Sequence, residues 1–295
     1  MWADVFSEGD LYIAETDALV GAGATWRSLK AAVEGGHLIR VRRGHYALPH
    51  TDRHIIEAAR VGGRLGCISA AAHAGIFVFD NSLTHIHVEP TSSRLRAPHD
   101  RFHRLGDENK DGVTLHWCQL RNGEDANDHS IGLTDALIQV LRCQEPRFAV
   151  ASLDSALHQG LILPQDIPGI FSSLPQDVQW LRTRIDARAD TGQETVLRFI
   201  LIDAGFEFEF QATILGAGRV DALVEGCVVV EADSRQYHDG WDAHSRDRTR
   251  DCELAIQGYM TYRALYRDIM FRPDRVVNAI AGLLAANKHY RVVLL

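Results

Sequence analysis

The chain has 295 residues, of which 46% are hydrophobic and 24% are charged, and its formal net charge is −8. This composition is typical of a globular protein, and the length predicts roughly two or three domains. The negative charge argues against a protein that coats nucleic acid, although local basic patches decide binding more than the total does. No apolar run approaches the roughly 20 residues that span a bilayer, and the acidic stretch MWADVFSEGDLY is unlike a signal peptide. We therefore expect a cytoplasmic protein that does not enter a membrane.

Residues 10–50 predict two helices followed by a short β-hairpin. Thr25 is a suitable N-cap for a helix over WRSLKAAVEGG, which ends at Gly35 and Gly36. The stretch HLIRVRRGHYAL then alternates, and its RRG segment predicts the turn between two strands. The alternation predicts that the arginines of the hairpin are exposed. It also predicts that the core contacts are made by Leu38, Val41 and Tyr46.

A helix-turn-helix followed by a basic β-wing is a DNA-binding arrangement, in which the second helix enters the major groove. The wing would contact phosphates, and the second helix adds two further cations. The candidate contacts with double-stranded DNA are Arg27, Lys30, Arg40, Arg42 and Arg43. Because the helix carries few charges for reading bases, a winged helix that serves protein contacts or packing is the alternative. The stretch LIRVRRGHYALP resembles the end of the winged-helix domain of AbiEi-type antitoxins, which autoregulate type IV toxin–antitoxin operons.

The middle region, residues 51–182, predicts a small-residue helix, two strands and two amphipathic helices. His85 and His87 share one strand face and could act as a pair of metal ligands. No acidic or cysteine partner stands at metal-site spacing in the sequence, which favours histidines exposed on a strand. This pattern resembles the α/β middle region that accompanies AbiEi-type winged helices in actinobacterial proteins, and the resemblance implies a scaffold or a partner surface.

Five cysteines are scattered singly along the chain. An odd number without any C-x-x-C spacing argues against a disulfide framework and against a zinc site. We expect buried free thiols at Cys67, Cys118, Cys143, Cys227 and Cys252.

Beyond a polar junction, residues 190–295 predict a third domain with the order helix, three strands, helix, strand, helix. Two of the strands, GRVDALVEG and CVVVEADS, would form a hairpin that turns at Gly226. In that register Asp221 faces Glu231, with Cβ atoms roughly 4.5–5.5 Å apart, and the period of two adds Asp233 to the same face. Opposed carboxylates are destabilising unless a cation lies between them, so the hairpin predicts a site for Mg²⁺ or Mn²⁺. A slip of one residue would move Asp221 to the other face.

Cationic side chains follow this hairpin closely in the sequence. His238 comes directly after the second strand, and the next helix carries Arg246, Arg248 and Arg250. Cations beside a metal-bound phosphate can stabilise the charge that develops during phosphoryl transfer. The alternative is a solvated helix face with ordinary ion pairs.

The ordered motifs RVD, VVVEAD, YH and RDRTRD resemble the PD-(D/E)XK nuclease superfamily, and within it the relatives of very-short-patch-repair (Vsr) endonucleases. The resemblance implies that Asp221 and Glu231 bind the metal, with Glu194 in support and the carbonyl of Ala232 as a further ligand. Asp233 stands where the superfamily has a lysine, and His238 could replace that lysine as general acid or base.

The sequence thus predicts a mixed α/β (α+β) chain with three domains. These are a winged helix over 1–50, a middle α/β domain over 51–182 and a restriction-endonuclease-like αβββαβ core over 190–295. The function predicted is a metal-dependent DNA endonuclease of repair or defence, and the site would act in a homodimer if both strands are cut. The alternative is an AbiEi-type antitoxin, a DNA-binding regulator whose nuclease-like domain is inactive.

Overall fold

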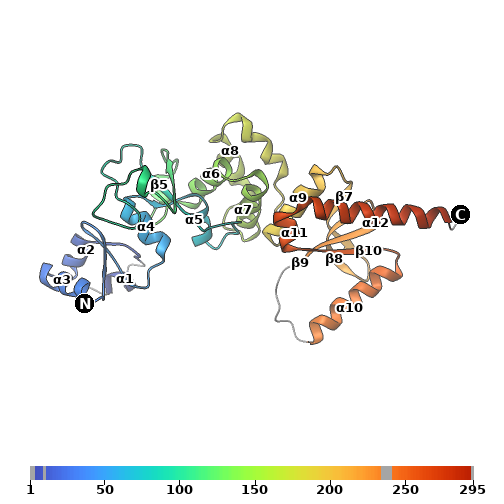
Figure 1. Cartoon of the computed structure of the whole chain (residues 1–295), viewed down its shortest axis with the longest axis horizontal. Coiled ribbons are helices and arrows are strands. Elements are labelled where there is room, and N and C mark those ends of the chain that lie inside the picture. The colour runs from blue at the N-terminus through green and yellow to red at the C-terminus, as the bar shows by residue number, and fades with distance from the viewer. Residues whose placement is uncertain (1–3, 9–10, 234–240, 294–295) are drawn as a thin grey trace. The chain divides into compact units, whose positions relative to one another are not determined.

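The computed structural model describes residues 4–8, 11–233 and 241–293, and for 7–8, 241–247 and 288–293 it describes the backbone alone. The described residues form a mixed α/β structure of helices and small sheets (Figure 1). Contacts divide the chain into two compact units, Met1–Gln144 with Pro164–Gln179, and Glu145–Leu163 with Trp180–Leu295. Among the described helices, none has the length and apolar character that a membrane span requires.

The first unit begins with a three-stranded antiparallel sheet of order β1-β3-β2 and three short helices. Its elements are α1 (Asp4–Glu8), β1 (Ala14–Glu15), α2 (Thr16–Gly21), α3 (Trp26–Glu34), β2 (Ile39–Arg42) and β3 (His45–Ala47). Thr25 caps α3 as predicted, because its hydroxyl accepts a hydrogen bond from the Ser28 N–H at 3.1 Å. The predicted turn between β2 and β3 is also confirmed, with Gly44 at a φ of 82°.

The core of this segment continues into the residues that follow it. Leu38 and Tyr46 are buried beside α2 and α3, as the alternation predicts. Ile13 and Val41 instead pack into a cluster that contains Ile55 and Leu65. Residues 11–48 and the following helices and strands therefore share apolar packing within one unit.

The rest of the first unit surrounds a second three-stranded sheet of order β4-β5-β6, in which β5 and β6 are parallel. Its elements are α4 (Arg53–Val61), β4 (Arg64–Leu65), α5 (Cys67–His73), β5 (Thr84–Val88), β6 (Val113–Trp117), α6 (Leu133–Cys143) and α8 (Ile167–Ser172). Short 3₁₀ segments complete the trace: η1 (Asp107–Asn109), η2 (Gly123–Asp125), η3 (Pro164–Asp166) and η4 (Gln176–Arg184), the last of which continues into the second unit.

The prediction of exposed histidines on β5 is wrong. All five residues of β5 are buried, and His85 and His87 are 5% and 1% exposed. The reason is topological, since β5 is the central strand of its sheet and α5 packs against it. A lone strand of alternating sequence does not reveal that both of its faces are covered.

The second unit is built on a four-stranded sheet of order β10-β9-β8-β7. Strands β7, β8 and β9 are antiparallel, and β10 is parallel to β9. Helices α9 and α12 lie on one side of this sheet, and α10 lies on the other (Figure 1). The elements are α7 (Pro146–His158), α9 (Gly192–Asp203), β7 (Phe208–Ile214), β8 (Gly218–Val224), β9 (Val228–Asp233), α10 (Trp241–Ile256), β10 (Met260–Leu265), α11 (Tyr266–Phe271) and α12 (Pro273–Val293).

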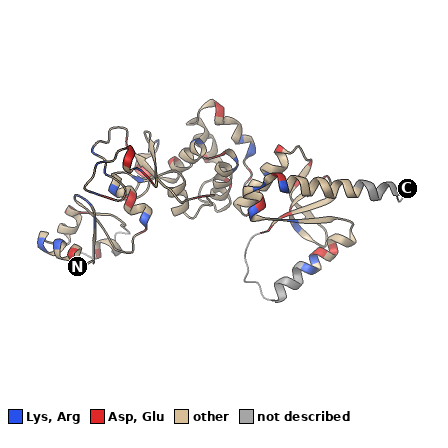
Figure 2. Ribbon diagram, in the orientation of Figure 1, with Lys and Arg blue, Asp and Glu red and all other residues tan. Residues whose placement is uncertain are grey.

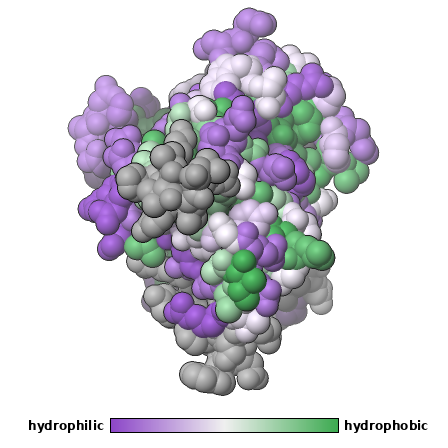
Figure 3. Space-filling view, turned by 90° about the vertical axis from the view of Figure 1, so that its right-hand side faces the viewer, coloured by the Kyte–Doolittle hydropathy of each residue, from purple (hydrophilic) through white to green (hydrophobic). Residues whose placement is uncertain are grey.

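The element order predicted for the end of the chain is confirmed, except that the short helix α11 was not foreseen. The hairpin register is confirmed as well: Ala222 pairs with Val230 and Val224 with Val228, around Gly226 at a φ of 64°. Some apolar side chains of this unit, such as Leu215 and Ile256, are exposed. On the face of the molecule drawn in Figure 3, apolar residues are interspersed with hydrophilic ones. Such scattered apolar residues are normal for a surface in water.

Candidate carboxylate site

Charged side chains form a row across three strands of the second unit's sheet. Glu231 on β9 is the register partner of Arg263 on β10. The register of β8 and β9, continued by one pair, places Asp221 opposite Glu231. The Ala232 N–H donates to Asp221 Oδ2 at 2.8 Å, which ties the carboxylate to the neighbouring strand. The row therefore brings the two predicted metal ligands onto adjacent strands.

Glu194 joins this row from the first turn of α9. It is only 6% exposed, and three donors hold its carboxyl group. Gln211 Nε2 and the Asp190 N–H donate to Oε2 at 2.7 and 2.9 Å, and Thr191 Oγ1 donates to Oε1 at 2.8 Å. The orientation of Glu194 is thus fixed by its local cap and by β7.

Burial makes these carboxylates reluctant to ionise. Burial, followed by the charge of Asp221, raises the pKa of Glu194 to about 7. Burial also raises the pKa of Asp221 and of Glu231, and in Glu231 the neighbouring Arg250 and Arg263 oppose that rise. Like charges in a poorly solvated place shift pKa values in this direction, and such shifts are common at functional sites.

Arginines supply the positive charge in this row. Arg250 Nη2 on α10 lies 2.6 Å from Glu231 Oε1, and Arg263 Nη1 lies 3.6 Å from Glu231 Oε2. Arg263 also pairs with Asp251 at 2.7 Å. The charge of Glu231 is therefore already compensated by protein groups.

The donor atoms of the row fit a hard divalent cation. Asp221, Glu231 and the Ala232 carbonyl offer oxygen ligands, the type that Mg²⁺ and Mn²⁺ prefer. Gln211 Oε1 is buried and accepts no hydrogen bond from the described residues, so a further oxygen is available beside the carboxylates. Within the described part of the chain, however, the acidic groups do not gather their ligand atoms as closely as a Cys–His cluster does elsewhere.

The remaining residues predicted for this site are more dispersed. Asp233 lies at the end of β9 and is exposed, so the buried carboxylates beside the half-buried Asp221 are Glu231 and Glu194. Arg248 is exposed on α10, 3.7 Å from Asp251. His238 and the side chain of Arg246 lie outside the described residues.

The predicted DNA contacts of the first unit differ in exposure. Arg27 and Lys30 are exposed on α3, and Arg43 is exposed at the hairpin turn. Figure 2 marks the Lys and Arg residues of the described chain in blue along the ribbon. Arg40 and Arg42 are half-buried, although the alternation predicted exposed side chains.

Packing explains the position of Arg42. Its guanidinium lies so close to Gly62 that a Cβ added there would collide with Nη1. Burial, and then the charge of Arg96, lower the pKa of Arg42. The hairpin therefore exposes fewer arginine side chains than the alternation predicted.

The first unit contains a cluster of two cysteines and two histidines that was not predicted from the sequence. The ligand atoms of Cys67, His85, His116 and Cys143 all lie within 4.8 Å of one another. A hydrogen bond to Cys143 and burial raise the pKa of the Cys67 thiol, whereas Cys67 and the imidazoles of His116 and His85 lower that of Cys143. The four residues come from four separate elements, so no local spacing could have revealed them.

Comparisons with models of protein families and with curated proteins found no match to this chain. No family is assigned. The resemblances drawn from short motifs stay hypotheses, and the function must be argued from the residues and their geometry.

The raised pKa of Glu194 predicts a specific dependence of stability on pH. Between its ordinary value near 4.5 and about 7, the folded chain retains a proton that the unfolded chain has lost. Stability should therefore fall as the pH rises through this window. Relative to Glu194→Gln, which is neutral in both states, the wild type should lose about 1–3 kcal/mol between pH 4.5 and 7.5.

Urea denaturation of both proteins across this range measures the effect. Glu209→Gln, which changes an exposed glutamate on β7, is the matched control. A difference between wild type and Glu194→Gln that stays constant with pH would contradict the assignment.

Proposed function

We propose that the second unit is a metal-dependent endonuclease that hydrolyses phosphodiester bonds of double-stranded DNA. The observation that carries the proposal is the placement of two carboxylates on adjacent strands, the half-buried Asp221 and the buried Glu231, with the buried Glu194 beside them. Arg250 and Arg263 compensate the charge of Glu231, whereas the charge of Asp221 acts against ionisation of Glu194. Clustered, poorly solvated carboxylates are costly to a fold unless they serve a purpose. A site for Mg²⁺ or Mn²⁺ is such a purpose.

The topology supports this proposal. Helix α9 precedes three antiparallel strands, and α10 leads to a fourth strand that runs parallel to β9. This order agrees with the restriction-endonuclease-like core that the resemblance to Vsr-type nucleases implies. In that resemblance the metal ligands also come from the hairpin that carries Asp221 and Glu231.

Each residue of the row has a role in this proposal. Asp221, Glu231 and the Ala232 carbonyl would hold the ion, which when bound polarises the scissile phosphate. Glu194 has a pKa near neutrality, so its carboxyl group can hold and release a proton at the pH of the cell. Arg250 places a guanidinium beside Glu231, where it can stabilise negative charge on the phosphate.

The first unit would bring DNA to this site. The order α2, α3, β2, β3, with β1 paired to β3, agrees with a winged helix whose second helix reads the major groove. Arg27 and Lys30 on α3 and Arg43 in the wing are exposed, where they could contact phosphates or bases, although Lys30 Nζ also lies 3.7 Å from Glu34 Oε1. Arg40 and Arg42, which are half-buried, would contribute less.

Incubation with plasmid and oligonucleotide duplexes, in the presence of Mg²⁺, Mn²⁺ or EDTA, tests the proposal. The expected result is cleavage that depends on the metal and is lost in Glu231→Ala. Glu209→Ala, which removes an exposed glutamate of β7, should leave cleavage unchanged. Cleavage that persists in EDTA or in Glu231→Ala would contradict the assignment of the site.

A DNA-binding regulator of the antitoxin type, with an inactive nuclease-like unit, is the second candidate. Two observations favour it: Asp233 stands where the nuclease superfamily has a lysine, and Arg250 already neutralises Glu231 at 2.6 Å. In that case the protein binds duplexes with an affinity that falls steeply with salt, and no metal induces cleavage.

A further inference from the structure

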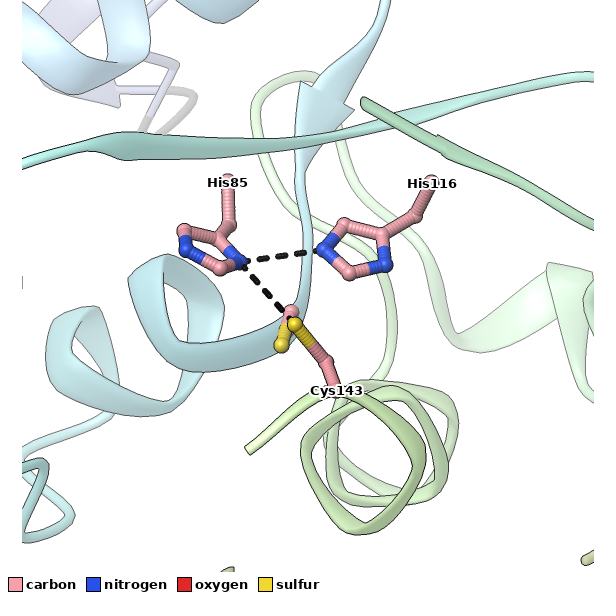
Figure 4. Close-up of side chains that lie close together, drawn as sticks. His85, His116 and Cys143 are labelled. Carbon is pink, nitrogen blue, oxygen red and sulfur yellow. Dashed lines mark hydrogen bonds between the residues drawn. The ribbon is translucent and has the colours of Figure 1, made fainter. Parts of the chain in front are cut away.

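The four side chains of the Cys–His cluster approach one another from four elements of the first unit. Cys67 begins α5, His85 lies on β5, His116 on β6, and Cys143 ends α6. His85 Nδ1 lies 3.0 Å from His116 Nε2 and 4.0 Å from Cys143 Sγ (Figure 4). The side chains point toward a common centre, from which they could bind one ion.

We propose that Cys67, His85, His116 and Cys143 bind a structural Zn²⁺ ion. Two thiolates and two imidazoles are a common ligand set of tetrahedral zinc sites. With Zn–S bonds of about 2.3 Å and Zn–N bonds of about 2.0–2.1 Å, tetrahedral geometry separates the ligand atoms by roughly 3.3–3.8 Å. The observed separations, all within 4.8 Å, are close to this requirement.

The identity of the donors selects the metal. Thiolate and imidazole ligands favour zinc over Mg²⁺, Mn²⁺ and Ca²⁺, which prefer oxygen. Four protein ligands occupy all the coordination positions of a tetrahedral ion. This is typical of a structural site and leaves no position for a substrate. The Zn²⁺ site is therefore chemically different from the carboxylate row, and it lies in the other compact unit.

Neighbouring hydrogen bonds hold the ligands in place. The Cys67 N–H donates to Gln139 Oε1 at 3.0 Å, and Gln139 lies one turn before Cys143 on α6. The His85 N–H donates to Ser69 Oγ at 2.9 Å. Both bonds are made by the backbone, so they fix the positions of Cys67 and His85 in the chain from which the two side chains reach the cluster.

The backbone of Cys67 supports the same conclusion. Its φ of 47° lies in the left-handed region, where a residue with a side chain is unfavourable. Gly66, just before it, leaves no room for a Cβ, because the atom would lie 2.7 Å from Gln139 Oε1 and 2.9 Å from the His87 N atom. The start of α5 is thus held in a strained conformation that directs the Cys67 thiol into the cluster.

The exposure of the four residues also suits metal binding. Cys67 and His85 are buried, His116 is half-buried and Cys143 is exposed. An ion can therefore reach the cluster from the side of Cys143. The four ligands come from α5, β5, β6 and α6, so a bound ion would link these elements and stabilise this part of the first unit.

Metal content of the full chain, purified under reducing conditions, is the first test. Elemental analysis and competition with a colorimetric chelator should give one Zn²⁺ per chain. Substitution with Co²⁺ should produce the absorption bands of a tetrahedral ion with thiolate ligands. Removal of the metal should lower the melting temperature, since the ion binds only the folded state.

Two variants locate the site. Cys143→Ser changes an exposed residue, so the fold should survive, and Zn²⁺ affinity should fall more than about 100-fold. Cys118→Ser is the matched control, because this thiol contacts His87 and Gln139 but lies outside the cluster. It should bind Zn²⁺ like the wild type.

Three results would overturn the proposal. One is a chain that binds no stoichiometric Zn²⁺, and another is equal affinity in Cys143→Ser and the wild type. The third is a disulfide between Cys67 and Cys143 in a separate preparation, made without reductant from cells whose free thiols are alkylated at lysis, and detected by mass spectrometry. None of these results depends on DNA cleavage, so the proposal of a Zn²⁺ site can be tested independently of the proposed nuclease activity.

Discussion

Replacement of Asp154 by alanine is expected to lower the free energy of unfolding of the second unit by about 3–5 kcal/mol. Asp154 on α7 is 1% exposed, and its Oδ2 lies 2.8 Å from Arg198 Nη2 on α9. Thr195 Oγ1 and the Asp186 N–H also donate to the carboxylate, both at 2.9 Å. Alanine would leave the Arg198 guanidinium, itself 5% exposed, without its counter-ion in a buried place.

The measurement should be made at pH 8, because burial raises the pKa of Asp154 to about 7 and the carboxylate is ionised above it. Hydrogen exchange of the α7 and α9 amides against urea concentration reports on this unit specifically. Arg248→Ala, which removes an exposed ion pair of the same unit, should change stability by less than about 1 kcal/mol.

A double variant distinguishes the cost of an unpaired charge from the value of the pair. Asp154→Leu combined with Arg198→Met removes both charges and should recover most of the lost stability. If the double variant is as unstable as Asp154→Ala, the loss comes from packing or from the hydrogen bonds of Thr195 and Asp186. The buried charge would then not be its cause.

Within the second unit, the elements of residues 190–295 were largely predictable because their signals are local, whereas α7 was predicted as part of the middle domain. Gly226 fixes the turn of the hairpin, and the period of two then places Asp221 and Glu231 without knowledge of any distant residue. Gly205 and Gly258, both at positive φ, follow the ends of α9 and α10 and are local stop signals of the kind that a sequence displays. Helix α11 was missed because six residues carry too little periodicity to be recognised.

The features of the structure that were not predicted depend on packing between segments that are distant in the sequence. The exposed histidine pair expected on β5 is buried, because β4 and β6 flank the strand and α5 covers it. The Cys–His cluster joins positions 67 and 143, which no spacing rule relates. Glu194 was predicted in support of the site, but its burial, while Asp233 is exposed, depends on contacts such as the hydrogen bond from Gln211 on β7 to Glu194 on α9. Such contacts depend on the tertiary structure, and the local patterns of a single sequence do not predict them.

Asp221→Asn is expected to reduce DNA cleavage by about 10²–10³-fold or more, without lowering stability. Asparagine has nearly the same shape and keeps an oxygen for the Ala232 N–H, which Asp221 Oδ2 accepts at 2.8 Å. It removes the negative charge on which metal binding depends. Because burial raises the pKa of Asp221, the ionised carboxylate is unfavourable in the fold, and its neutral replacement should leave the melting temperature equal or higher.

This opposition between activity and stability separates a functional carboxylate from a structural one. Sites that are arranged for function often gain stability when their charged groups are neutralised. A purely structural Asp221 would show the reverse, with a lower melting temperature in Asp221→Asn and no change in any activity of the protein. Asp233→Asn is the companion variant, since Asp233 is exposed on the same strand as Glu231. A loss of cleavage in Asp233→Asn equal to that in Asp221→Asn would return Asp233 to the site, whereas full activity would leave Glu194 as its third carboxylate.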